Sequence, residues 1–501
     1  MDRTQENFEL DDDLDLDLVE HQLSTRNSVH DRTQFESKFD FELGDATQKA
    51  GQKSYEVDMY MFLPKSMGVS SETYPRNSFY ADLTHLLRVR TPELQRRRGG
   101  LFVGPRLSSV EEYFAAHLDT VKRNKLSQLV VHDTKLFGCL VYTELKRLQA
   151  DLSRVIKRSK STQRPDLVLR FHTRLMQRLE SVHASIRNYR ERYVWRLKTE
   201  PILVDQEVQR ALFLVDEYLS YRLESSSIAM YSKLQPFGEG VEDLLFQIEA
   251  LLTGELAYRA DHIQTADARK SRVETHYYRL GLLKKYVSEV LFLQTRRINK
   301  DYVYRNFIAA FGAGLAAFFA TLANIQTFQM VSGQQEMGLR IFTLLVLGVT
   351  AYIFKDRIKD LSKDYFNHRL KSWLPDFDVQ MSYTHYDAEG QSEAVYLGTS
   401  QELVRYLSRT SLPPDIDYVR ELGHRTKLEP ERLETVLNYN KRMKFDVKDE
   451  LRDHFGEARI KRIHDVLRFD VSHFLAKLAD PQKRLSYFDP EKGIVTTDAP
   501  K

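Results

Sequence analysis

A histidine followed by an aspartate, at His464–Asp465, is a pairing that metal-dependent phosphohydrolases use, and His454 and His473 lie nearby. That chemistry needs several His and Asp side chains from separate helices to converge on one metal ion. Here the pair alternates with arginines, which is typical of the solvated face of an amphipathic helix. We therefore expect no metal site. Cys139, in LFGCLVY, has apolar neighbours and is expected to be an inert core residue.

Signatures of other chemistry are absent or misplaced. The chain contains no H-E-x-x-H, P-loop, G-x-S-x-G or kinase motif, so we expect no catalytic residue and no cofactor. A G-x-G-x-x-A motif occurs at Gly312, but a dinucleotide-binding turn needs a preceding strand, and a basic helix is expected there. The spacing of Gly312, Ala316 and Ala320 instead predicts a face of small residues for close helix packing, either against Gly348 of the same chain or against the same helix of a neighbouring chain.

Two uncharged runs dominate the stretch 304–355. The run 307–328 holds 22 residues, or about 33 Å of helix, and the run 337–354 would give about 27 Å. Together they predict a two-helix transmembrane hairpin with the lipid bilayer as partner. The residues expected at the membrane interface are cationic or aromatic: Arg305, Arg340, Lys355, Arg357 and Trp373.

The flanking charges predict an orientation. Four Lys or Arg residues precede Phe307 within fifteen positions and six lie between Lys355 and Lys371, whereas the loop side offers Arg340. By the positive-inside rule both termini are then cytoplasmic, in a multi-pass protein of a bacterial cell inner membrane. A single cysteine and an acidic N-terminus without an apolar signal segment fit this expectation.

The region 106–303 shows the strongest helical periodicity. From Val168 to Tyr193 apolar residues recur every three or four positions, which predicts an amphipathic helix between the breaks at Pro165 and Pro201. Further long helices are expected at about 126–160, 204–231, 241–262 and 270–303. Helices of this length favour an elongated bundle, a coiled coil or a stalk.

The two ends of the chain are predicted to differ from this centre. Residues 1–52 carry 14 acidic against 5 basic side chains up to Ala50, a net charge of −9, and read as a disordered tail. Within the tail, DDDLDLDLVE alternates acid with leucine, which also favours a docking arm, either for a partner or for the basic stretch Arg88–Arg106 of the same chain.

The sequences on either side of the helical region 106–303 predict a small α+β portion. In 53–105 a strand is expected at Tyr55 and a helix at 79–89, and 356–375 reads as a basic juxtamembrane helix. In 376–501 the sequence predicts a β-hairpin around Asp387–Gly390 and helices near 400–408, 429–443 and 457–478. We expect the strand at Tyr55 to pair with that hairpin, because a two-stranded hairpin alone is marginal.

The layout of helices leading into two close apolar runs resembles the two-helix magnesium channels in outline. Their Gly-Met-Asn motif is replaced here by ANIQTFQMVSG, so the resemblance implies no site residues. The sequence as a whole predicts a mostly α protein with a small α+β portion, acting as a membrane-anchored scaffold or signalling protein. Homo-oligomers or protein partners through the helices are expected, and nucleic acid is not. An oligomeric channel or transporter is the alternative, and a tethered enzyme without a recognisable motif stays open.

Overall fold

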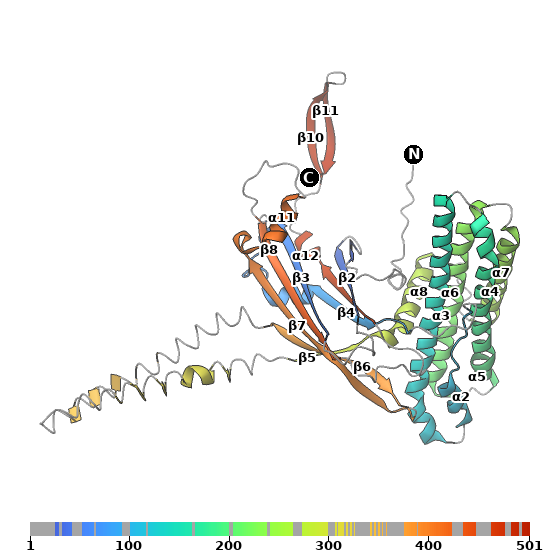
Figure 1. Ribbon diagram of the computed structural model, residues 1–501, viewed down its shortest axis with the longest axis horizontal. Helices are drawn as coiled ribbons and strands as arrows, with labels where there is room; N and C mark the ends of the chain where they lie inside the picture. The colour runs from blue at the N-terminus through green and yellow to red at the C-terminus, as the bar shows by residue number, and fades with distance from the viewer. Residues whose placement is uncertain are drawn as a thin grey trace.

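The computed structural model describes most of the chain. The described residues are 26–29, 33–42, 53–64, 67–92, 101–116, 119–162, 166–199, 204–237, 241–263, 273–298, 375–387, 389–422, 434–446, 462–475, 482–489 and 493–500, together with scattered positions between 306 and 357. Two regions are visible in Figure 1, a helical bundle and a group of antiparallel sheets beside it.

The bundle is made of long helices that pack side by side (Figure 1). α8 lies at the edge of the bundle nearest the sheets and α7 at the opposite edge. The elements of this region are α2 (Ser108–Ala115), α3 (Thr120–Thr162), α4 (Asp166–Tyr189), the π-helical turn η3 (Arg190–Val194), α5 (Trp195–Thr199), α6 (Gln206–Leu234), the 3₁₀ turn η5 (Gln235–Phe237), α7 (Glu242–His262), α8 (Val273–Ser288) and the 3₁₀ turn η7 (Glu289–Leu291).

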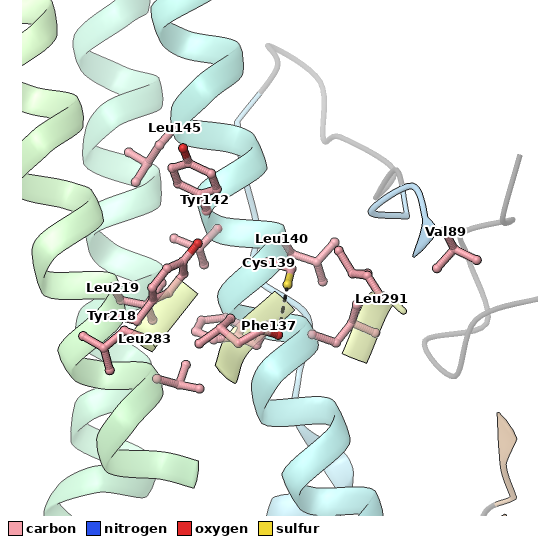
Figure 2. Packing of buried hydrophobic residues seen from close by; sticks show 14 of the residues in the cluster. Val89, Phe137, Cys139, Leu140, Tyr142, Leu145, Tyr218, Leu219, Leu283 and Leu291 are labelled. Atoms are coloured by element: carbon pink, nitrogen blue, oxygen red, sulfur yellow. Dashed lines mark hydrogen bonds between the residues drawn. The ribbon is translucent and has the colours of Figure 1, made fainter. Parts of the chain in front are cut away.

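Helix α3 runs through the core of the bundle. Figure 2 shows it between Tyr218, Leu219 and Leu283 on one side and Leu291 on the other. Gly138 allows the close approach, because a Cβ at this position would lie 2.9 Å from Cγ1 of Val287. The core therefore depends on a missing side chain in α3 as well as on apolar ones.

The strands form two larger antiparallel sheets and a separate hairpin. The four-stranded sheet has the order β1-β2-β9-β4 and the five-stranded sheet the order β3-β8-β7-β6-β5, while β10 pairs with β11. The bounds are β1 (Arg26–Val29), β2 (Gln34–Glu42), β3 (Lys53–Pro64), β4 (Leu83–Val89), β5 (Gln294–Ile298), β6 (Phe377–Tyr386), β7 (Ser392–Leu407), β8 (Glu434–Phe445), β9 (Arg462–Asp470), β10 (Gln482–Asp489) and β11 (Gly493–Pro500).

Short helices and turns complete the sheet region. They are α1 (Arg76–Asp82), the 3₁₀ turn η8 (Arg409–Ser411), α11 (Pro414–Leu422) and α12 (Ser472–Leu475). Aromatic rings join the facing sides of the two sheets: Phe41 packs against Phe445, and Phe79 of α1 contacts both Tyr439 and Phe469. One continuous apolar core runs from these rings into the bundle.

The bundle and the sheets are joined at several points. The turn between β6 and β7 packs on the start of α3, where Gly390 has a φ of +83° and a Cβ would overlap the carbonyl oxygen of Lys125. Next to β4, the amide of Leu293 donates to the carbonyl of Leu87 at 2.9 Å. The chain leaving α8 is thereby held against the edge of the four-stranded sheet.

The expected fold class is wrong, because strands make up far more of the chain than a small α+β portion. The ranges expected as helices at 400–408, 429–443 and 457–478 fall largely on strands β7, β8 and β9. Charged residues that face inward, such as Lys441 and Asp465, interrupt the apolar alternation by which a strand is recognised.

Several smaller expectations also need correction. The acidic tail 1–52 contains β1 and β2, the helix expected at 79–89 ends at Asp82 and continues as β4, and the helix expected at 270–303 ends at Ser288. The strand at Tyr55 shares a sheet with the β6–β7 hairpin, but its direct partner is β8, which lies between them.

The predicted membrane hairpin is not supported, and with it the inner-membrane localisation. Within the part of the chain that the structure describes, no helix combines the length and the apolar composition that crossing a bilayer requires. The channel or transporter alternative stays a prediction, because no finding tests it.

The residues predicted for that hairpin are placed only in part. Gly312 is buried within a described helical turn and Arg357 is exposed, with no described contact between them. The remaining predicted positions lie outside the described residues: Ala316, Ala320, Gly348, Arg305, Arg340, Lys355 and Trp373.

Candidate functional site

The first candidate is a cluster of charged side chains between the two large sheets. Lys441 of β8 and Asp465 of β9 are both 0% exposed, and the lysine Nζ lies 2.5 Å from Oδ2 of the aspartate. His85 of β4 approaches Oε1 of Glu402 at 3.2 Å and the hydroxyl of Tyr439 at 3.2 Å. Five polar side chains thus meet between the two large sheets.

The charged side chains of this cluster pair with one another. Burial alone would raise the pKa of Glu402, but the neighbouring His85 and Lys441 hold it below its ordinary value. Burial raises the pKa of Tyr439 well above its ordinary value. Each described charge of the cluster meets an opposite charge, and its side chains are buried except for His85, which is 14% exposed. The cluster is therefore interpreted as a structural tie between the sheets.

His464 and Asp465 correct the expectation of a solvated helix face. Both lie on strand β9, where consecutive side chains point to opposite sides, and both are buried. Asp465 faces Lys441, whereas His464 pairs with Asp40 across the other face of the sheet. His473 stacks on Tyr74, and His454 lies outside the described residues. Among the described residues no three His, Cys, Asp or Glu side chains gather as a metal site would need.

The bundle contains a second closed cluster. Arg190 of η3 donates to Asp216 at 2.7 Å and to both oxygens of Glu255, and its guanidinium lies 3.7 Å from the ring centre of Tyr258. Burial would raise the pKa of Glu255, yet Arg190 holds it below its ordinary value. This network is also buried and internally paired, so it offers no surface to a ligand.

The third candidate is open to the surface. A pocket of about 380 Å³ lies between α6 and the end of α8, which we call the α6–α8 groove. Its floor is apolar and includes Leu282, which is 43% exposed. Its lining residues are Leu214, Leu282, Leu283, Tyr286 and Phe292, with Arg210, Arg279, Lys285 and Glu289 supplying the charges.

Two of the groove's charges are already engaged. Arg279 binds both carboxylate oxygens of Glu217, at 2.8 and 2.6 Å, and this bond raises the pKa of Arg279. Glu289 pairs with Lys135 at 2.7 Å, and the same ammonium lies over the ring of Tyr286. Burial raises the pKa of Tyr286, so its hydroxyl stays protonated at neutral pH.

The other two cations differ from these. Arg210 and Lys285 are exposed, and neither makes an ion pair with another described residue. They stand beside an apolar floor, so an anionic group that also carries apolar side chains would satisfy both parts of the groove. A pocket of this volume can hold a few side chains of a peptide segment.

Helical periodicity builds the groove. On α6 the positions Arg210, Leu214 and Glu217 recur at spacings of four and three, and on α8 Arg279, Leu282 and Tyr286 do the same. The sequence predicts helices in both stretches, but it does not show that these two faces adjoin. Leu282 lies between Arg279 and Lys285 on α8, and this exposed apolar residue between cations is the signal that sequence reasoning missed.

No protein-family model, no curated protein and no solved structure matches this chain.

Proposed function

We propose that the protein is an interaction scaffold whose α6–α8 groove binds an acidic, leucine-containing peptide segment. The observation that carries the proposal is the exposed apolar floor at Leu282 beside Arg210 and Lys285, two cations without an ion-pair partner among the described residues. Leucine side chains of the ligand cover the floor and its carboxylates meet the two cations. Catalysis is not required of any of these groups.

The chemistry sets the expected strength of binding. Burying a leucine side chain contributes about 1.5–3 kcal/mol, while each exposed ion pair adds about 0.2–1 kcal/mol. Loss of translational freedom and ordering of the peptide oppose these gains. We therefore expect a dissociation constant of about 10–100 µM that weakens as salt screens the ion pairs.

The test uses fluorescence anisotropy with a labelled peptide of the sequence ELDDDLDLDLVE. The protein is the full chain with Leu14→Ser, Leu16→Ser and Leu18→Ser, so that its own acidic leucines do not compete with the probe. Arg210→Ala with Lys285→Ala should weaken binding by about two- to thirtyfold, from the loss of two exposed ion pairs. A peptide with serine in place of leucine should bind at least tenfold more weakly than the probe.

A matched control removes the same charges elsewhere. Arg158→Ala with Lys160→Ala deletes one arginine and one lysine from the exposed side of α3. This pair should leave binding unchanged within about twofold. Equal binding by the groove variant and the control variant would overturn the proposal, because the peptide would then respond to net charge alone.

A further inference from the structure

The N-terminal segment Asp11–Glu20 has the composition that the groove requires. Its sequence, DDDLDLDLVE, holds six carboxylates and no cation. Leu14, Leu16 and Leu18 alternate with aspartates, so an extended chain would place the leucines on one side and the carboxylates on the other. One side matches the floor of the α6–α8 groove and the other matches Arg210 and Lys285.

The four-stranded sheet carries the start of the described chain towards the groove. Arg26 of β1 lies opposite Lys38 of β2, Lys38 lies opposite Val466 of β9, and Val466 lies opposite Leu86 of β4. β4 runs on from Leu86 to Arg88, which bridges to Phe292 in the groove lining. Since β1 runs antiparallel to β4, the chain preceding Arg26 leaves the sheet at the end where Phe292 lies.

The separation is within reach of the segment. Four strand spacings separate β1 from Phe292, which is about 19 Å across the sheet. Leu16 is ten residues from Arg26 and can lie up to about 33 Å from it along an extended chain. The leucines of the segment can therefore reach the groove of the same molecule.

We propose that residues Asp11–Glu20 bind in the α6–α8 groove of their own chain and compete there with a partner's acidic segment. This inference rests on the proposed function and names the first occupant of the same site. A tethered segment of this length has an effective concentration of about 1 mM. With an intrinsic dissociation constant of about 10–100 µM, it lowers the apparent affinity for a free peptide by roughly ten- to a hundredfold.

The first experiment compares the unaltered full chain with the Leu14→Ser, Leu16→Ser, Leu18→Ser variant. The labelled peptide ELDDDLDLDLVE should bind the variant at least tenfold more tightly. Equal, measurable binding to both proteins would overturn the inference and leave the proposed function standing. Binding to neither protein would overturn the proposed function, and the inference would fall with it.

A second experiment reads the contact directly. Leu16→Cys and Leu282→Cys should form an intramolecular disulfide under mild oxidation, seen as a cross-linked peptide by mass spectrometry. Background is low, because the chain has one native cysteine, Cys139, and it is buried. The control pairs Leu16→Cys with Phe246→Cys, an exposed position on α7 at the opposite edge of the bundle (Figure 1).

The outcomes of this second experiment are distinct. A disulfide within one chain at Leu282, formed at least tenfold faster than at Phe246, supports the inference. Covalent dimers instead of closed monomers would overturn it, because the segment would then reach a second copy. Equal rates at both positions would also overturn it, because contact would be random.

Discussion

The sheet interior and the α6–α8 groove both place cations beside apolar surface, but they satisfy them differently. Lys441 lies at full burial against Asp465, whereas Arg210 and Lys285 stand exposed without a described counter-charge. A buried and paired charge is committed to the fold, because losing its partner is costly. An exposed charge beside an open apolar floor remains available to a ligand. Mutation of the sheet pair should therefore lower stability, whereas mutation of the groove cations should weaken binding with little change in stability.

The largest effect on stability is expected inside the sheets. Lys441→Met leaves the carboxylate of Asp465 buried without its cation, and should lower the free energy of unfolding by about 3–5 kcal/mol. Urea denaturation followed by circular dichroism measures the loss. The double variant Lys441→Met with Asp465→Leu should recover most of the stability, because neither member of the pair is then buried without its partner. A single variant within about 1 kcal/mol of the wild type would contradict a structural role for this pair.

The next largest effect concerns the turn by which the sheets rest on the bundle. Gly390→Ala puts a Cβ on a residue with φ of +83° and into the carbonyl of Lys125, so we expect a loss of about 2–3 kcal/mol. Gly68→Ala is the control, since Gly68 also has positive φ but open space around its Cβ position. It should cost about 1–2 kcal/mol. Equal losses at both positions would show that the Lys125 contact contributes nothing.

Acid should weaken the helical bundle and the sheet interior over different ranges of pH. Burial lowers the pKa of His183 on α4, so the unfolded chain takes up the proton first and stability falls as pH drops below about 6.5. The pKa of Glu402 is also lowered, and its contribution is present above about 4.5 and lost as pH falls through the lower folded-state pKa.

Denaturation midpoints measured from about pH 8 to about pH 2 check this order. His183→Gln should flatten the fall in stability just below pH 6.5, and Glu402→Gln should flatten only the fall below about pH 4.5. If His183→Gln left the fall in stability just below pH 6.5 unchanged, His183 would not be its cause.

The smallest effect on stability belongs to the groove. Arg210→Ala with Lys285→Ala should change the free energy of unfolding by less than about 0.5 kcal/mol, because both side chains are exposed. The same variant should weaken peptide binding by about two- to thirtyfold. A loss of more than about 2 kcal/mol in stability would place these cations with Lys441 as parts of the fold.

The sequence predicts the bundle better than the sheets, for a physical reason. Helical periodicity from Val168 to Tyr193 is local and survives the polar residues between its apolar positions. β8 and β9 instead point Lys441 and Asp465 towards the core. These two side chains form an ion pair only because two strands from different sheets face each other, and neither strand alone shows this. Inward-facing charge therefore made these strands resemble helices with a solvated face.

The α6–α8 groove also could not be predicted from local sequence, because its two helices lie far apart in the chain. Arg210 and Lys285 lie 75 positions apart in sequence, and nothing in either helix alone shows that they share a surface. The acidic leucine segment is readable from the sequence as a docking arm, but its predicted target within the chain was Arg88–Arg106. The register of β1 with β4 and the bridge to Phe292 now favour the α6–α8 groove.

The most direct measurement of the groove's role is hydrogen–deuterium exchange with and without the peptide ELDDDLDLDLVE. It uses the full chain carrying the three leucine-to-serine substitutions. We predict slower exchange at the amides of Val273–Phe292 on addition of the peptide, with no change in β8 and β9. Unchanged exchange in Val273–Phe292 at saturating peptide, or protection confined to the sheets, would contradict the assignment of the groove as the binding site.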